Sequence, residues 1–197
     1  MRKHMILMLA AVGIVLQLAG CAKSDSAVTE TTIEVKKNGS VVHTIVESFA
    51  EDYYDLEELK SSITASCDEY NEIAGKGSVE LASANLQDGV LYVVMNYKSA
   101  AAYAGFNKQA LYLGTVKDAY NAGYDLNVTL LSADSEVGTV GKAELLDMGD
   151  KHMLIVREAV DVGVWDEILY YSDDVIERDN NTVMVSDSSS LTYIVFE

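Results

Sequence analysis

The 197-residue sequence contains no proline and only two cysteines, Cys21 and Cys67. Because proline is absent, its turns must be built from Gly, Asn, Asp and Ser, which tolerate the backbone conformations of tight turns. Two cysteines cannot form the disulfide framework of a small secreted scaffold, and the sequence has no paired cysteines for a metal or redox site. The fold must therefore be held together by a hydrophobic core.

Basic residues are also scarce. The sequence has 14 Lys and Arg against 31 Asp and Glu, which gives a formal net charge of −17. So acidic a chain repels phosphate backbones and anionic lipid surfaces, and this argues against nucleic acid as a partner. Because 49% of the residues are hydrophobic, the chain is nevertheless predicted to fold rather than to remain disordered.

The usual catalytic and cofactor motifs are missing. There is no Gly-x-Ser-x-Gly, His-Glu-x-x-His or Gly-x-Gly-x-x-Gly pattern. The segment Gly138-Thr139-Val140-Gly141-Lys142 looks like a phosphate loop, but its glycines are too close together, and Ala143 stands where a Ser or Thr must bind magnesium. The sequence therefore predicts a non-catalytic protein with no cofactor and no metal site.

The first twenty-one residues have the pattern of an export signal. Arg2 and Lys3 give a basic start, residues 5–19 are apolar apart from Gly13 and Gln17, and the segment ends in Leu18-Ala19-Gly20-Cys21. This apolar run is shorter than the roughly 20 residues that a membrane-spanning helix needs. A retained transmembrane helix is therefore the weaker interpretation, and an ordinary secretory leader with a chance cysteine is the other alternative.

In these residues the chain resembles the bacterial lipoproteins. In that class the cysteine sulfur receives a diacylglycerol, the leader is removed before the cysteine, and the new amino terminus is usually acylated too. The resemblance implies that residues 1–20 are a signal peptide, that Leu18, Ala19 and Gly20 belong to the lipobox, and that Cys21 carries the lipid. Two acyl chains anchor a protein stably. We therefore expect the mature protein on the extracytoplasmic face of the cell membrane.

Residues 21–32 are predicted to be the lipidated cysteine and a flexible tether, because residues 22–32 show no apolar periodicity. As a random coil such a tether would span roughly 18 Å. Residues 33–197 are predicted to form a single folded α+β domain, with possible subdomains at 33–124 and 125–197.

Two β-hairpins are predicted in the first half of this domain. The first covers residues 33–46 and turns at Lys37-Asn38-Gly39-Ser40, where Asn-Gly is the strongest two-residue turn signal. The second joins residues 79–84 to residues 89–97 across Asn85-Leu86-Gln87-Asp88. Because residues 90–95 are apolar without alternation, we expect a central strand that is covered on both faces.

A helix is predicted over residues 51–74. Its apolar residues recur every three or four positions, at Leu56, Leu59, Ile63, Cys67, Tyr70 and Ala74. Acidic residues gather in its first turns, where the helix dipole favours them, at Glu51, Asp52, Asp55, Glu57 and Glu58. The stripe places Cys67 on the buried side, and we expect an inert core thiol there rather than a reactive one.

The remaining chain is predicted to be mostly strands. Short helices are expected near residues 99–105 and 115–122, with a short strand at 110–113. Strands are expected at residues 126–131, 140–146, 152–157, 159–164, 167–171, 182–185 and 191–196. Strands at this spacing favour an antiparallel meander or small barrel. The predicted fold class is therefore α+β, with one long amphipathic helix packed on an antiparallel sheet, followed by a β-rich meander or small barrel.

A few polar and aromatic residues are candidates for binding. His43 and His152 have no second metal ligand nearby in the sequence and are predicted to be structural. The acidic loop of Asp173, Asp174, Glu177 and Asp179 is predicted to be solvated, with calcium binding left open. Aromatic residues gather at Tyr103, Phe106, Tyr112, Tyr120 and Tyr124. We expect these five to serve packing, with a protein-facing patch or a glycan site as alternatives.

The functional hypothesis is a membrane-anchored, non-catalytic cell-envelope lipoprotein that binds another envelope component, with an envelope protein as the expected partner. A small-molecule or glycan-binding receptor is the first alternative, and it predicts a deep cavity lined by aromatic residues. An envelope hydrolase is the second, and it needs a polar constellation around His43 or His152. The sequence alone does not name the ligand-binding residues.

We predict that Cys21→Ser abolishes labelling of the protein by a tagged fatty acid in growing cells, because the acceptor sulfur is lost. The same variant should leave the membrane fraction or accumulate as the uncleaved precursor. Cys67→Ser is the matched control and should be labelled normally. Unchanged labelling of the Cys21 variant would contradict the lipoprotein assignment.

Overall fold

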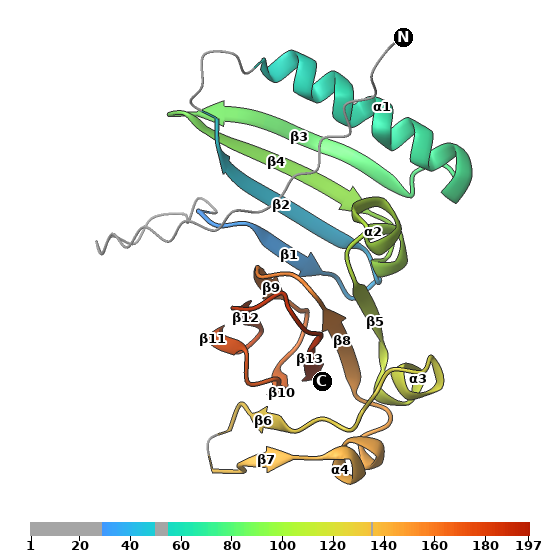
Figure 1. The fold of residues 1–197 in the computed structure, drawn as a ribbon, viewed down its shortest axis with the longest axis vertical. Helices are drawn as coiled ribbons and strands as arrows, with labels where there is room; N and C mark the ends of the chain where they lie inside the picture. Colours follow the sequence, from blue (N-terminus) through green and yellow to red (C-terminus); the bar gives the residue numbers. More distant parts are fainter. Residues whose placement is uncertain (1–28, 50–54, 135) are drawn as a thin grey trace.

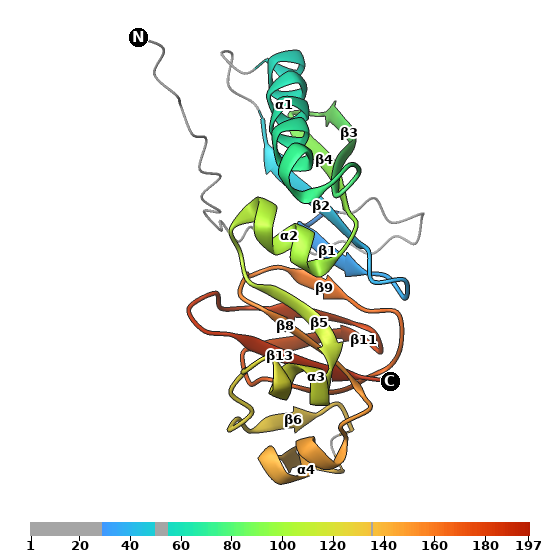
Figure 2. The same ribbon diagram turned by 90° about the vertical axis from the view of Figure 1, so that its right-hand side faces the viewer.

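The computed structural model describes residues 29–49, 55–134 and 136–197, which form two β-sheets and four helices (Figure 1 and Figure 2). The first sheet has the strand order β11 (Val175–Asp179), β12 (Thr182–Val185), β9 (Asp161–Gly163), β1 (Thr32–Val35), β2 (Val41–Ser48), β4 (Val90–Tyr97) and β3 (Val79–Gln87). The second has the order β5 (Leu111–Thr115), β8 (His152–Val156), β13 (Thr192–Phe196), β10 (Ile168–Tyr171), β6 (Leu130–Ser132) and β7 (Thr139–Val140). The helices are α1 (Leu56–Ala74), α2 (Ala100–Asn107), α3 (Val116–Asn121) and α4 (Lys142–Asp147).

The predicted fold class is wrong. The described chain is strand-rich, and its helical residues are divided among four helices instead of one long helix. Its second half is not a separate meander or barrel, because β9, β11 and β12 join the first sheet. That sheet is mixed rather than antiparallel, since β9 pairs with β1 in parallel. The apolar pattern of a short strand indicates which face is buried but not which distant strand lies beside it. The strand order, and with it the fold class, therefore could not be predicted from the sequence.

The first hairpin is confirmed. The Gly39 N–H donates to the Lys36 carbonyl at 2.8 Å, and the Lys36 N–H donates to the Ser40 carbonyl at 2.9 Å. The second hairpin is present, but its turn is at Asp88-Gly89 rather than at residues 85–88. Asp88 and Gly89 have φ values of 52° and 77°, as expected for a turn that needs positive φ at both central positions. Strand β3 is longer than predicted for this reason.

Helix α1 begins after Asp55, whose carboxylate accepts hydrogen bonds from the Glu57 and Glu58 N–H groups at 2.8 and 3.1 Å. This cap satisfies two donors that have no partner inside the helix. The first four residues of the predicted helix, 51–54, lie outside the described residues. The apolar stripe packs against the first sheet, and the buried position predicted for Cys67 is confirmed. Ala74, the last residue of the predicted stripe, is exposed.

Two neighbouring interior strands of the second sheet, β8 and β13, are buried on both faces. In β8, Leu154 and Val156 belong to the core shared with the first sheet, whereas Met153 and Ile155 belong to a second core on the opposite face. Strand β13 alternates between the same two cores. The second core is closed by residues of α3, α4, β6 and the segment between α3 and β6, among them Val116, Leu145, Leu130 and Leu126.

Two strand predictions need correction. Strand β4 does lie between β2 and β3, but only its alternate residues Leu91, Val93, Met95 and Tyr97 are buried, so it is not fully covered on both faces. The strand predicted at residues 140–146 is mostly helix α4. The Gly141 N–H donates to the Glu144 carboxylate at 3.1 Å, a helix-start contact that outweighs the apolar appearance of this segment.

We predict that Leu154→Ala lowers the free energy of unfolding by about 2–5 kcal/mol, because it removes a side chain with no exposed surface from the shared core. Ile73→Ala is the control, since Ile73 is 88% exposed on α1, and it should change stability by no more than about 0.5 kcal/mol. Denaturant unfolding measures both values. Equal losses in the two variants would contradict this arrangement of the core.

Candidate functional site

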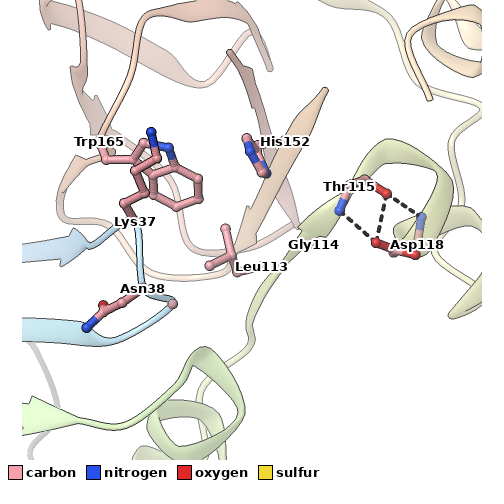
Figure 3. A pocket seen from close by; sticks show the side chains of 9 residues that line it. Lys37, Asn38, Leu113, Gly114, Thr115, Asp118, His152 and Trp165 are labelled. Atoms are coloured by element: carbon pink, nitrogen blue, oxygen red, sulfur yellow. Dashed lines mark hydrogen bonds between the residues drawn. The ribbon is translucent and has the colours of Figure 1, made fainter. Parts of the chain in front are cut away.

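Two neighbouring hollows lie between the β1–β2 turn and strand β5, and Figure 3 shows the larger of them. Their volumes are about 490 and 300 Å³, and they share Gly39 and Leu113. We call the combined depression the β5 groove. The larger hollow is lined by Lys37, Asn38, Gly39, Leu113, Gly114, Thr115, Asp118, His152 and Trp165, and the smaller one by Gly39, Ser99, Ala100, Ala101, Leu111, Tyr112 and Leu113.

An aromatic wall borders the larger hollow. The His152 and Trp165 rings meet edge-to-face with centroids 4.7 Å apart, and the Phe196 ring lies 4.7 Å from Trp165 and 5.3 Å from His152. Phe196 has no exposed surface, so the two partly exposed rings are held against the core. A ring surface fixed in this way can bind a ligand without first losing side-chain freedom.

Some polar residues of the groove already have hydrogen-bond partners within the protein, and others do not. The Asp118 carboxylate accepts hydrogen bonds from the Thr115 hydroxyl at 2.8 Å and from the Thr115 N–H at 3.2 Å. These bonds lower the pKa of Asp118 and begin helix α3, so this carboxylate has a structural role. Lys37 is exposed and has no hydrogen-bond or ion-pair partner among the described residues. Figure 3 shows Lys37 and Asn38 at the opposite end of the hollow from Thr115 and Asp118.

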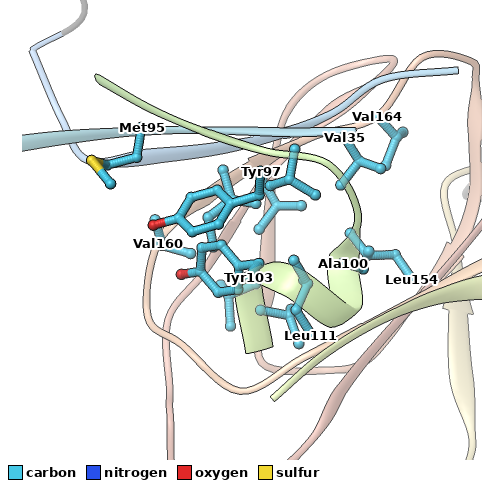
Figure 4. Close-up of a cluster of buried hydrophobic side chains, with 14 of the residues drawn as sticks. Val35, Met95, Tyr97, Ala100, Tyr103, Leu111, Leu154, Val160 and Val164 are labelled. Carbon is cyan, nitrogen blue, oxygen red and sulfur yellow. The ribbon is translucent and has the colours of Figure 1, made fainter. Parts of the chain in front are cut away.

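A second polar cluster lies inside the core rather than in the groove. His43 is 5% exposed, its ring meets the Tyr103 ring at 5.3 Å, and neither ring nitrogen has a hydrogen-bond partner within the described chain. The Tyr103 hydroxyl donates to the Glu158 carboxylate at 2.6 Å, and burial raises the pKa of Glu158. Figure 4 shows Tyr103 beside Tyr97 with both hydroxyls on the same side, and the two rings meet edge-to-face with centroids 5.0 Å apart. No residue of either hollow belongs to the His43, Tyr103 and Glu158 cluster, so it is a packing element.

The aromatic residues that gather in the sequence are dispersed in the structure. Tyr103 and Phe106 pack in the shared core, and Tyr112 and Tyr124 meet in the second core with ring centroids 4.7 Å apart. Tyr120 is 50% exposed, and the Lys142 ammonium lies 5.7 Å from its ring. These residues form no common binding patch, and the prediction that all five serve packing is confirmed for the other four and wrong for Tyr120.

The predicted site candidates outside the groove offer no metal site. Within residues 29–49, 55–134 and 136–197, no three His, Cys, Asp or Glu side chains are placed to hold a metal ion. The predicted acidic loop is wrong for Glu177 and Asp179, which lie in strand β11, and the Asp174 carboxylate before this strand accepts a hydrogen bond from the Thr192 hydroxyl. Burial raises the pKa of the Cys67 thiol, which disfavours the reactive thiolate.

No protein-family model matches this chain, and neither a curated protein nor a solved structure matches it. In the part of the chain that the structure describes, no helix is long and apolar enough to cross a membrane.

Lys37 and Trp165 were not predicted to lie in one site. Trp165 is the only tryptophan, and it stands in the short connection between β9 and β10, while Lys37 belongs to a strong turn signal. Each of these two residues stands out in the sequence by itself. Their proximity depends on the pairing of β1 with β9, two strands more than 120 positions apart, for which the sequence carries no local signal.

We predict that His43 makes the protein less stable in acid. Burial lowers the pKa of His43 to about 4 from its ordinary value of 6.5. The unfolded chain therefore takes up a proton near pH 6.5, whereas the folded chain does so only near pH 4. Stability should fall across this range by up to about 3 kcal/mol from His43 alone.

His43→Leu removes this contribution. The raised pKa of Glu158 acts in the opposite direction, because the folded chain then binds a proton more readily than the unfolded one, and this effect is common to both proteins. The loss of unfolding free energy between pH 7 and pH 4 is measured for the wild type and for His43→Leu. The difference between the two losses is the contribution of His43. A variant that loses as much stability as the wild type would contradict the prediction.

Proposed function

We propose that this protein is a non-catalytic, lipid-anchored protein of the cell envelope that binds another envelope component through the β5 groove. The observation that carries the proposal is the groove itself. It combines rings held by the core with an unpaired lysine at its rim, and these are features of a binding surface.

The groove chemistry favours binding over catalysis. Covalent catalysis needs a nucleophile within hydrogen-bond reach of a general base. The hydroxyl of Thr115 donates to Asp118 as part of a helix cap, and His152 packs between Trp165 and Phe196 without a hydrogen bond to a hydroxyl in the described chain. No activated nucleophile therefore faces the larger hollow among these residues.

The expected anchor agrees with a role in contacting a neighbour in the envelope. The predicted tether joins the proposed lipid at Cys21 to β1, whose first residue is Thr32, so the folded body would stay within the length of this tether from the membrane. A body with this much negative charge is repelled by an anionic lipid surface. The groove is therefore available to a partner rather than pressed against the membrane.

A glycan is the second candidate ligand, since sugar rings stack on exposed aromatic faces and hydrogen-bond to side chains such as Asn38. Trp165 and Asn38 both line the larger hollow. The two hollows continue into one another along β5, which suits an elongated ligand better than a small compact one.

A photo-activated cross-linking residue placed at Asn38 in intact cells tests the proposal. Asn38 is exposed at the groove, and the matched control position is Ile73, which is 88% exposed on α1. We expect one envelope component to be captured at position 38 and not at position 73, and Lys37→Glu to reduce that capture. Equal capture at both positions would contradict a role for the groove.

The captured component can then be titrated against the purified protein. Because Trp165 is the only tryptophan and lines the larger hollow, its fluorescence should change as the groove fills. Trp165→Phe should bind without this signal and serves as the control. Saturable binding that leaves Trp165 fluorescence unchanged would place the contact elsewhere.

A further inference from the structure

Strand β5 forms one edge of the second sheet and pairs only with β8 in the described chain. The Arg157 N–H donates to the Ala110 carbonyl at 3.1 Å, and the Val116 N–H donates to the Lys151 carbonyl at 2.9 Å. Hydrogen-bonded pairs alternate along an antiparallel ladder. The residues of β5 that bond to β8 are therefore Tyr112 and Gly114, which lie between these two pairs.

The intervening residues Leu111 and Leu113 direct their backbone N–H and C=O groups away from β8. Both residues line the smaller hollow, and Leu113 also lines the larger one. No hydrogen bond of the described residues uses these outward groups. The β5 groove thus follows a row of unpaired donors and acceptors, which is the template that an added strand requires.

The other sheet edges are protected in ways that β5 is not. Proteins discourage edge pairing with charged residues, bulges or very short strands. Strand β11 carries Glu177, Arg178 and Asp179 and a register shift, β3 has a register shift after Leu81, and β7 has only two residues. The β5 sequence, Leu-Tyr-Leu-Gly-Thr, has no charge, and its ladder with β8 is regular.

The groove has room for the side chains of such a strand. Ala100 and Ala101 give the smaller hollow a wall of small residues, and Trp165 and His152 give the larger hollow an aromatic wall. A strand of five residues spans about 17 Å, and its alternate side chains point to the same face. Two apolar side chains of one strand can therefore occupy the two hollows in turn.

The charge near the groove indicates a further property of the partner. Lys37 lines the larger hollow, and Lys98 precedes Ser99 of the smaller one. Neither lysine has an ion-pair partner in the described chain, although acidic residues outnumber basic ones by 31 to 14. The Asp118 carboxylate also lines the larger hollow and keeps its negative charge, but it lies at the opposite end from Lys37 (Figure 3), so the Lys37 end of the hollow is positive.

We propose that the β5 groove binds an extended protein segment of about five residues, which adds to the second sheet as a strand beside β5 and places a carboxylate near Lys37. The carboxylate belongs either to an acidic side chain or to a chain terminus. This inference rests on the proposed function and specifies the form of the partner.

A displayed library of random seven-residue peptides, with both free and blocked carboxyl termini, is the probe. It is selected against the mature chain carrying Cys21→Ser, which leaves out only the expected lipid. Selected peptides should alternate apolar residues and contain an acid or require the free terminus, and these two results distinguish the sources of the carboxylate. Lys37→Glu should weaken their binding at least tenfold, whereas Lys60→Glu makes the same change of charge on α1 and should not.

Changes to the peptide backbone test whether the peptide binds as a strand. N-methylation of the peptide amides that face β5 should weaken binding at least tenfold, while N-methylation of the alternate amides should leave it nearly unchanged. Hydrogen exchange of the Leu111 and Leu113 amides should slow at least tenfold in the complex. The Tyr112 amide, which already bonds to β8, should not change and is the internal control.

The remaining outcomes overturn the inference in distinguishable ways. One such outcome is that peptides change Trp165 fluorescence while N-methylation has no alternating effect and the Leu111 and Leu113 amides exchange as before. This result would exclude strand addition but leave the groove as a binding site. Failure to select any binding peptide would exclude an extended partner, and cross-linking at Asn38 then decides the proposed function separately. If hydrogen exchange of the Leu111 and Leu113 amides slows as the protein concentration rises in the absence of peptide, a second copy of this chain occupies the edge.

Discussion

The parallel pairing of β1 with β9 is the contact on which the rest of the structure depends. It consists of three residue pairs, from Thr32 with Asp161 to Glu34 with Gly163. Through it the first hairpin and the last third of the chain become one sheet, and Ile33, Val162 and Val183 lie side by side with no exposed surface. A pairing so short is stabilised less by its own hydrogen bonds than by the apolar face that it completes.

The site follows from this pairing. The β1–β2 turn carries Lys37 and Asn38, and the chain that leaves β9 carries Trp165, so both reach the groove because their strands are neighbours. The opposite wall comes from β5 and β8 of the second sheet. A site assembled from five separate segments needs all of its long-range contacts, and such contacts form slowly in folding.

The features that could be predicted from the sequence are those with a local cause. The Asn38-Gly39 turn and the buried stripe around Cys67 each depend on residues a few positions apart, whereas Asp55 was expected within the first turns of the helix and instead caps its start. Helix α4 was missed because the Glu144 contact to Gly141 is weak evidence beside an apolar run. The strand order was missed because many strands of similar length and composition could pair with β1, and only the complete core distinguishes among them.

The position of Phe196 has a consequence for the time at which the binding surface exists. The wall formed by His152 and Trp165 rests on this residue, which belongs to the last strand described. A chain that crosses a membrane amino terminus first would expose its turn and its tryptophan long before residue 196 arrives. Until then the aromatic rings have no support and the second sheet lacks a central strand. The groove therefore becomes competent to bind only after residue 196 has joined the fold.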